Sequence, residues 1–493
     1  MLFILITAVS IITVIVTYLV SQIRKPKNLP PGPLWWPFVG NLPELKKLSK
    51  SLGGQHLALA QLAKTYKTNI LGLKLGNEYV VTVFSYRIVR EVFLREEFEG
   101  RPTNFFTKLR CMGKIQGVTA TDGELWRIQK NLINRHLHNL GLGKTPMEEM
   151  IRDEVVEMLS ALRDDGSNVK VDKFIAPGVL NVLWTLTTGA RISKNQLDEL
   201  LDLFAARSKA FDLTGGTLAL YPWLRFVAPE WCGFNLIQEI NNKLKKLFEK
   251  IIEEHRETWH EGRNDDLIYR YISESKAPNK NSAVFNDDQL IMLCLDLFIG
   301  GNNNTSGTLD FGFLLMILHP DVQQKVQAQL DTTFSKNHIL EYSDRDKLPY
   351  VEAVILEIMR FRHVAPLAGP RRVTKDTYLD GYFLPKDTTI LLSLHSINNN
   401  AEYWKDPENF MPERFLDENG LLLPHEKLLS FGSGRRRCVG EVLAKTCIFF
   451  FFVEILKNFY VSVTPGSKLP SSKPVPGMIL STEPYWATFT ERS

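Results

Sequence analysis

The chain has 493 residues, of which 44% are apolar and 11% aromatic, enough to bury the core of a large globular protein. Its formal net charge of +4 is too small to favour nucleic-acid binding, so we predict no nucleic-acid partner. The five cysteines are odd in number and lack the paired spacing of metal sites: Cys111, Cys232, Cys294, Cys438 and Cys447. They indicate a reducing compartment rather than a disulfide framework.

The chain begins with an apolar segment. Residues 2–20 carry no charge, and a helix of that length spans the ~30 Å hydrocarbon core of a bilayer. A cleaved signal peptide is the alternative, but the segment lacks a basic start and a clear small-residue cleavage site. Because Arg24 and Lys25 follow the apolar run, the positive-inside rule leaves the remaining chain in the cytoplasm. We predict that residues 1–22 form a single-pass transmembrane signal-anchor.

A short linker follows the apolar segment. Residues 23–33 are first basic and then proline-rich, and the run Leu-Pro-Pro-Gly-Pro at 29–33 cannot continue a helix. We predict a stiff spacer here. No second linker, internal repeat or low-complexity tract interrupts the rest of the chain, so residues 34–493 are predicted to form one catalytic domain.

Helical periodicity dominates the body. Apolar residues recur with a period of 3.6 at 54–66, 146–163, 176–188, 196–211, 235–261, 286–319, 322–334, 348–362 and 441–458. A further helix is expected to begin near Asp122. Short strand-like runs occur at 70–75, 79–84, 378–384 and 388–393. The predicted fold class is therefore mainly α with small β-sheets.

The segment 286–319 breaks the helical rule at its centre. Residues 300–307 read Gly-Gly-Asn-Asn-Asn-Thr-Ser-Gly, and each glycine costs about 1 kcal/mol relative to alanine in a helix. The amide and hydroxyl side chains compete for backbone hydrogen bonds. We therefore expect a local widening of the helix at this point.

Residues 431–440, Phe-Gly-Ser-Gly-Arg-Arg-Arg-Cys-Val-Gly, hold the most informative cysteine. Gly434 permits a tight turn, and the arginines can bind carboxylates. The sequence after Cys438 is helical in character, so this cysteine lies at a helix N-terminus whose amides and dipole favour a thiolate. A thiolate is the iron ligand of haem proteins that cleave O–O bonds. The alternative is a buried structural cysteine.

The pattern Phe-x-x-Gly-x-Arg-x-Cys-x-Gly resembles the cysteine loop of the cytochrome P450 family, and further motifs follow the family's order. Residues 357–360, Glu-Ile-Met-Arg, resemble its Glu-x-x-Arg motif, whose acid and base share one helix face. Residues 412–415, Pro-Glu-Arg-Phe, resemble the segment whose arginine joins that pair. The pattern is similar to the animal microsomal type, insect members included. The resemblance implies the P450 fold, haem b with Cys438 as its iron ligand, and a structural network of Glu357, Arg360 and Arg414.

Further cofactor-binding residues follow from the same resemblance. Trp126 and Lys130 match Trp-x-x-x-Arg, whose members reach haem propionates, but lysine lacks the bidentate grip of arginine. Arg371 and Arg436 complete the predicted set. For Lys130 and Arg372, a solvated surface charge is the alternative.

The centre of the long helix resembles the family's oxygen-binding groove, which has the form Ala/Gly-Gly-x-Asp/Glu-Thr-Thr/Ser. Here Asn303 replaces the acid, Asn304 replaces the usual threonine, and Thr305 matches. In the family, the acid and the hydroxyl help to deliver protons to bound dioxygen. Asparagine cannot ionise, but Asn304 can donate a hydrogen bond and hold a water, and Thr305 can supply a hydroxyl. We predict Asn303, Asn304 and Thr305 as the catalytic residues.

Three functions agree with these residues. The preferred one is a monooxygenase that inserts one atom of O₂ into a lipophilic small molecule of sterol, terpenoid, fatty-acid or xenobiotic type. The second is a haem-thiolate isomerase or dehydratase that acts on a hydroperoxide without O₂ or NADPH. The third is a non-catalytic haem-binding sensor.

The resemblance also implies partners and a location. NADPH and flavins act only through NADPH-cytochrome P450 reductase, cytochrome b5 is a further candidate partner, and the enzyme lies at the endoplasmic reticulum membrane. A basic patch that recruits an acidic electron-transfer protein is expected at Arg127, Arg135, Arg435, Arg436 and Arg437, with a solvated charge run as the alternative.

The substrate pocket is expected to be mostly apolar. Its predicted walls are residues 105–119, 211–231, 298–304, 364–367 and 477–480. The aromatic-rich segment 218–231 is predicted to be a lid that enters lipid, with a buried core element as the alternative.

Overall fold

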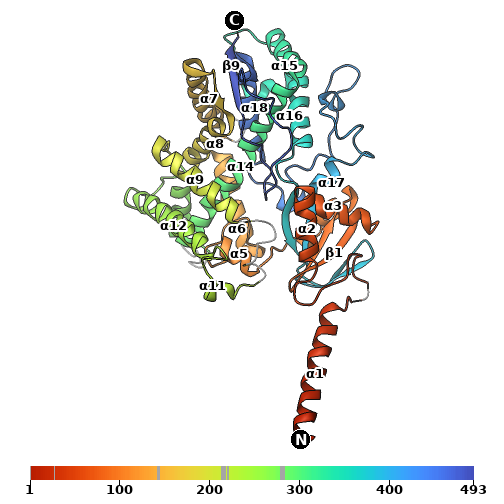
Figure 1. The fold of residues 1–493 in the computed structure, drawn as a ribbon. Coiled ribbons are helices and arrows are strands. Elements are labelled where there is room, and N and C mark those ends of the chain that lie inside the picture. The colour runs from red at the N-terminus through yellow and green to blue at the C-terminus, as the bar shows by residue number, and fades with distance from the viewer. Residues whose placement is uncertain are drawn as a thin grey trace.

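The computed structural model describes residues 2–26, 28–141, 145–211, 218, 221–277 and 284–492. The body is mainly helical with small β-sheets, so the predicted fold class is confirmed (Figure 1). The described helices are α1 (Leu2–Ile23), α2 (Leu42–Leu52), α3 (Gln55–Thr65), α4 (Tyr86–Leu94), α5 (Phe105–Arg110), α6 (Gly123–Asn139), α7 (Thr145–Asp165), α8 (Val171–Thr188), α9 (Lys194–Ala210), α11 (Leu224–Val227), α12 (Phe234–Glu257), α13 (Leu267–Lys276), α14 (Asp287–Leu318), α15 (Pro320–Thr333), α16 (Pro349–Phe361), α17 (Leu394–Asn398) and α18 (Glu441–Asn458).

The strands form three small sheets. They are β1 (Ile70–Leu75), β2 (Glu78–Val83), β3 (Val169–Lys170), β4 (Leu367–Arg372), β5 (Thr377–Leu379), β6 (Tyr382–Leu384), β7 (Thr389–Ser393), β8 (Phe459–Val463) and β9 (Trp486–Glu491). The largest sheet has the order β1-β2-β7-β4, in which only the β2–β7 pair is parallel. A bulge in β4 between Ala368 and Arg371 shifts the register opposite β7, and it re-aims the side chains at the end of the strand.

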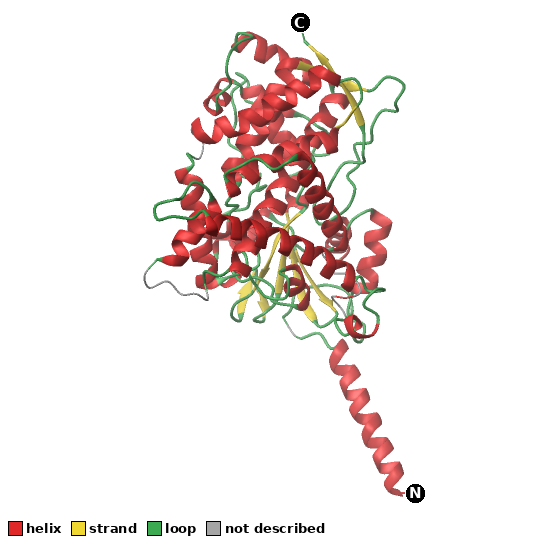
Figure 2. Cartoon of the chain, turned by 90° about the vertical axis from the view of Figure 1, so that its left-hand side faces the viewer, coloured by secondary structure: helices red, strands yellow, loops and turns green. Residues whose placement is uncertain are grey.

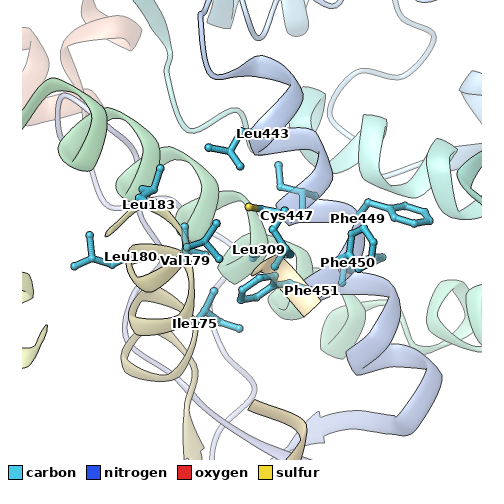
Figure 3. Packing of buried hydrophobic residues seen from close by; sticks show 14 of the residues in the cluster. Ile175, Val179, Leu180, Leu183, Leu309, Leu443, Cys447, Phe449, Phe450 and Phe451 are labelled. Carbon is cyan, nitrogen blue, oxygen red and sulfur yellow. The ribbon is translucent and has the colours of Figure 1, made fainter. Parts of the chain in front are cut away.

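The main core lies where α8, α14 and α18 meet (Figure 3). Val179 of α8 lies beside Leu309 of α14, and phenyl groups of α18 such as Phe451 complete this part of the cluster. Helix α18 is apolar on all faces from Ile448 to Val453, which is typical of a helix surrounded by protein. Each fully buried side chain of this kind contributes about 1.5–3 kcal/mol through removal from water.

The expected widening of the long helix is wrong, because α14 is a continuous α-helix from Asp287 to Leu318. The polar side chains at its centre do not displace backbone bonds. Ser306 Oγ donates to Asn302 O (2.7 Å), and Thr308 Oγ1 donates to Asn304 O (2.8 Å), each four residues back. These second hydrogen bonds to carbonyls that already serve the helix leave its backbone ladder intact.

Most predicted helices agree with the structure, and the helices predicted at 146–163, 286–319 and 441–458 lie within two residues of α7, α14 and α18. The single strand predicted at 378–384 is wrong. The chain turns at Asp380 and Gly381, which have φ values of 48° and 83°, so β5 and β6 form a hairpin instead.

The N-terminal helix α1 extends away from the body as a separate rod (Figures 1 and 2). In the described part of the chain, no helix combines the length and the apolarity needed to cross a membrane. The prediction of a membrane-spanning segment at residues 1–22 therefore finds no support. The following linker contacts two sheets: Gly72 N of β1 donates to Pro31 O (2.8 Å), and Phe383 N of the β5–β6 hairpin donates to Asn28 O (2.9 Å).

Candidate active site between α14 and the Cys438 loop

A cavity of about 370 Å³ lies between the centre of α14 and the loop that precedes α18. Cys438 lines one side of it, and Asn304 and Thr305 line the α14 side. Its other walls include the apolar side chains of Val118, Leu183, Leu297, Val364, Leu367 and Leu443. This volume and this mainly apolar lining are typical of a site for a small molecule.

The loop that carries Cys438 is shaped by glycine. Gly434 has a φ of 68°, and a Cβ on it would lie 2.2 Å from Phe93 O, so only glycine fits under the end of α4. Cys438 N donates to Phe431 O (3.0 Å), which closes the loop three residues before α18 begins. The side chain of Cys438 therefore has a fixed place on the cavity wall.

The electrostatics of Cys438 differ from the expectation of a thiol activated by the helix alone. Burial raises the pKa of the Cys438 thiol, and the Gly440 amide, Lys130 and Arg437 only partly oppose this effect. A metal ion bound to the sulfur would oppose this effect and favour the thiolate.

A cluster of three arginines lies at the edge of the cavity. Burial, followed by repulsion from Arg436, lowers the pKa of Arg371 to about 10, and burial also lowers the pKa of Arg436 to about 10. The pKa of Arg101 is lowered well below its usual range by burial and by the two other guanidinium groups. Within the described residues, none of the three forms an ion pair with a carboxylate.

The unpaired donors of this cluster fit a dianionic group. Arg371 Nε and Nη1 and Arg101 Nε are buried without a hydrogen-bond partner among the described residues. Buried donors of this kind cost free energy unless a ligand supplies acceptors. Carboxylates are the natural partners of such guanidinium groups, so the site fits the two propionates of a haem. The residues present therefore fit a haem with Cys438 at its iron.

Arg101 was not predicted from the sequence. Its Nη1 donates to Gly369 O (2.9 Å) and Pro370 O (2.6 Å), across more than 260 residues of chain. No local motif marks it, because its position depends on the packing of the segment before α5 against β4. By contrast, Arg372 is neither a solvated charge nor a cavity residue, since it pairs with Asp122 (2.7 Å) and Asp387 (2.9 Å).

Trp126 and Lys130 lie one turn apart on α6, and both line the cavity. The guanidinium of Arg436 stacks on the Trp126 ring at 3.9 Å from its centroid, and it donates to Glu99 O and Thr121 O. Lys130 Nζ donates to Arg435 O in the cysteine loop. The ammonium group of Lys130 thus contacts the backbone that holds Cys438.

Glu357, Arg360 and Arg414 are joined by hydrogen bonds below the cavity. Arg360 Nε and Nη2 donate to the two oxygens of Glu357 at 2.7 and 2.8 Å, and Arg414 Nε donates to Glu357 at 3.1 Å. Glu357 and Arg360 are fully buried. Arg360 also binds Asn398 O and Pro407 O, so the network fixes the segment between α17 and the cysteine loop.

The structure brings two of the three predicted oxygen-activation residues to the cavity. Asn304 Nδ2 donates to Gly300 O (2.6 Å), which fixes the amide plane at the cavity wall. Thr305 also lines the cavity, and its hydroxyl has no hydrogen-bond partner among the described residues. Asn303 does not line the cavity, and its Nδ2 instead lies 3.5 Å from Ser208 Oγ on α9.

Asp296 is a further cavity residue that sequence reasoning missed. Its Oδ2 accepts from Val118 N (2.8 Å) and Thr119 N (2.9 Å), and its Oδ1 accepts from Thr119 Oγ1 (2.6 Å). Gly117 has a φ of 81°, and a Cβ there would lie 2.3 Å from Asp296 Oδ2. The carboxylate therefore positions a loop that lines the cavity. An acid within an apolar run one turn before Gly300 was the available signal.

The predicted pocket walls are only partly those observed. Residues from 117–119, 297–304 and 364–367 line the cavity, whereas residues 477–480 do not. Leu480 instead packs behind Val364, and its N donates to Val364 O (2.7 Å). Most of the segment 212–220 lies outside the described residues.

The arginines of the predicted basic patch are largely paired. Arg435 pairs with Glu96 (2.6 Å), Arg437 with Glu441 (2.7 Å) and Arg135 with Glu274 (2.9 Å). Arg127 forms no ion pair within the described ranges. The cysteine side of the molecule is therefore less basic than a count of its arginines indicates.

A cysteine that faces a small-molecule cavity beside unpaired buried guanidinium groups defines the class of this protein, which is a haem-thiolate protein. The family model for cytochrome P450 matches residues 30–489. The chain belongs to the cytochrome P450 family, and it is a monooxygenase with haem b as its cofactor.

Relatives match along nearly the whole chain. The probable cytochrome P450 305a1 of Drosophila melanogaster is 42% identical over 487 residues, which is 96% of this chain and 96% of that protein. The farnesoate epoxidase of Bombyx mori is 35% identical over 478 residues, again 96% of both chains. Cytochrome P450 2J5 of Mus musculus is 33% identical over 488 residues, 97% of this chain and 95% of that protein.

Proposed function

We propose that this monooxygenase inserts one atom of O₂ into a lipophilic small molecule, with electrons from NADPH delivered by NADPH-cytochrome P450 reductase. The observation that carries the proposal is the cavity itself, in which Cys438 lies across from Asn304 and Thr305 and the remaining walls are mostly apolar. An apolar wall favours a sterol, terpenoid, fatty acid or xenobiotic. The relative named farnesoate epoxidase supports a terpenoid among these classes.

The residues that hold the cofactor are those of the cysteine side. Bound haem supplies the site at which dioxygen binds and electrons arrive, and a thiolate ligand suits it to O–O bond cleavage. Cys438 would provide that ligand, and Arg101, Arg371 and Arg436 would bind the propionates. Trp126 supports Arg436 by stacking, and Lys130 holds the loop backbone.

Proton handling falls to Asn304 and Thr305. One N–H of the Asn304 amide donates to Gly300 O. The second N–H and Oδ1 can therefore orient a water in the cavity. The Thr305 hydroxyl is then the protein group that can pass a proton from that water at its Oγ1. Because neither group ionises near neutral pH, this relay is weaker than one with an acid. We assign to Asn303 the role of holding α9 against α14 through Ser208.

We further propose that the enzyme is attached to the cytoplasmic side of the endoplasmic reticulum membrane. Apolar side chains are exposed along α1, Phe3 and Val14 among them, and Trp223, Phe226 and Trp231 are exposed around α11. Aromatic side chains of this kind favour the membrane interface. Arg127 on the cysteine side remains free to attract the reductase or cytochrome b5.

Turnover under labelled oxygen gas tests the proposal. The full-length protein is reconstituted with the reductase, NADPH and a panel of sterols, terpenoids and fatty acids. We expect one labelled oxygen atom in the product of at least one substrate, together with release of peroxide because the relay is weak. Conversion of a lipid hydroperoxide without NADPH, and no label on any substrate, would instead identify an isomerase or dehydratase.

A further inference from the structure

Asp310 is a buried acid that the proposed chemistry does not use. It lies on α14 beyond the groove, it is only 6% exposed, and it does not line the cavity. Thr482 Oγ1 donates to its Oδ2, and Tyr485 OH donates to its main-chain oxygen (2.8 Å). Its Oδ1 is buried without a hydrogen-bond partner in the described part of the chain. Burial of a carboxyl group costs free energy, and here the hydrogen bond from Thr482 offsets part of that cost.

The segment that Asp310 holds reaches the cavity wall. Val475 and Ser481 exchange two backbone hydrogen bonds, which close a turn before Thr482. Within this turn, Leu480 N donates to Val364 O (2.7 Å), and Val364 lines the cavity. A Cβ on Gly307 of α14 would lie 3.3 Å from Val364 Cγ1 and 3.9 Å from Leu480 O. The turn and the wall residue Val364 therefore pack side by side against α14 at Gly307.

We propose that Asp310 is a positioning residue for ligand size: through Thr482 it holds the 475–482 turn, and the turn sets how far Val364 projects into the cavity. Asp310 itself touches no ligand. The chain of contacts runs from the carboxyl to Thr482, along the backbone to Leu480, and from Leu480 N to Val364 O. Loss of the first contact lets the turn and Val364 move together, which changes the room for a bulky ligand and not for a small one.

The ionisation state of Asp310 changes the strength of its hydrogen bond with Thr482. Burial raises the pKa of Asp310 to about 7, against the lowering effect of Thr482 and Tyr485, and Asp172 raises it further. Among the described residues, Tyr485 and Asp172 are the titratable groups that shift the pKa of Asp310. The neighbouring helices α16 and α18 contact α14 with apolar side chains, such as Ile358 and Phe452. The ionised form binds the Thr482 hydroxyl more strongly than the neutral form, because a charged acceptor makes the stronger hydrogen bond.

Two haem-binding azoles of different size test the proposal without a known substrate. Spectral titration of the full-length haem protein with imidazole and with bulky clotrimazole is compared for wild type, Thr482→Val and Thr482→Ser. We expect Thr482→Val to change the clotrimazole Kd by about fivefold, the effect of roughly one hydrogen bond, with the imidazole Kd unchanged. Thr482→Ser keeps the hydroxyl and restores the wild-type value, and Thr332→Val on remote α15 is the control.

The pH dependence separates a held turn from general damage. In the wild type, we expect the ratio of the clotrimazole Kd to the imidazole Kd to change between about pH 6 and pH 8. Asp310→Asn should abolish this change, because its side chain keeps a hydrogen-bond acceptor but cannot ionise. Equal effects on both azoles, or clotrimazole values unaffected by Thr482→Val and by pH, would overturn the inference. The inference rests on haem binding as described above, so the CO spectrum of the same samples reports separately whether the haem-thiolate site has formed.

Discussion

The two sides of the cavity satisfy their polar groups in different ways. On the cysteine side, charged groups are fixed by bonds between distant segments, such as Arg436 to Glu99 O and Arg414 to Glu357. On the α14 side, the carboxylate of Asp296 is taken up by the loop at residues 118–119, and the polar groups nearest the groove are neutral. Among the described residues, Thr305 Oγ1 and Asn304 Oδ1 have no hydrogen-bond partner. The groups that would hold the cofactor are thus charged and fixed, whereas the two proton-handling residues, Asn304 and Thr305, are uncharged and depend on water. The four predictions below test this contrast.

Replacement of Cys438 should have the largest effect. Cys438→Ala removes the thiol assigned as the iron ligand, so we expect loss of the strongly red-shifted CO band of reduced thiolate-ligated haem and loss of turnover. Absorption spectroscopy of the reduced CO complex measures this. Cys447→Ala, in the same helix region, should keep the band, and a histidine-like CO spectrum in the wild type would contradict the assignment.

The Glu357 network should rank second. Glu357→Ala leaves Arg360 and Arg414 buried without their carboxylate, which costs roughly 3–5 kcal/mol of unfolding free energy. We expect a lower Tm and poor haem incorporation rather than slow turnover alone. Glu426→Ala, which removes an exposed carboxylate, serves as the control. A stable, haem-replete Glu357→Ala protein would show that the buried pair contributes little.

The arginine cluster should affect how long haem stays bound. Arg371→Ala removes a buried guanidinium whose Nε and Nη1 have no hydrogen-bond partner among the described residues. A charge-assisted hydrogen bond from it to a propionate would contribute about 1.5–3 kcal/mol to the free energy of haem binding. We expect haem to transfer to apomyoglobin roughly tenfold faster or more. Arg127→Ala removes an arginine without an ion pair and should leave the transfer rate unchanged. Equal rates for both variants would mean that Arg371 does not bind the propionates.

Changes on the α14 side should have the smallest effect. Asn304→Thr supplies a hydroxyl at the cavity wall, and Asn303→Asp adds an ionisable acid next to it on the side of α14 that faces α9, so less NADPH should be lost to peroxide. We expect the product formed per NADPH to rise by a factor of roughly 2–10. Simultaneous assays of NADPH, peroxide and product provide the measurement. Poorer coupling in this variant would show that the amides are already the better relay.

Local motifs explain how much of the site was predictable. Cys438, Glu357 and Arg360 stand in short patterns whose geometry is set by one loop or one helix face, so the sequence indicates their surroundings. Arg101 and Asp296 owe their positions to contacts with β4 and with residues 117–119, which no short pattern records. The error in α14 has a similar origin, because the sequence shows poor helix formers but not the carbonyls that accept from their side chains.

The boundaries of the fold show the same division. Long periodic helices such as α14 and α18 were predicted closely, since a period of 3.6 accumulates over many residues. The hairpin of β5 and β6 was missed although Asp380-Gly381 is a strong hairpin signal, because the apolar residues on both sides were assigned to one strand. Residue types on the α14 side were visible in the sequence, but only packing determines that Asn303 turns toward α9 and Asn304 toward the cavity.

The fit of Gly434 beneath Phe93 O has a consequence for the order of folding. Phe93 belongs to the core around β2 and β7, whereas Gly434 lies in the cysteine loop, more than 300 residues later in the chain. Contacts between such distant segments form slowly, because a long loop must close before they stabilise anything. The core around Phe93 itself joins residues 70–98 to residues 373–429, so the cysteine loop fits under Phe93 only when segments far apart in the chain have met. We therefore expect haem capture to be a late step in the maturation of this enzyme.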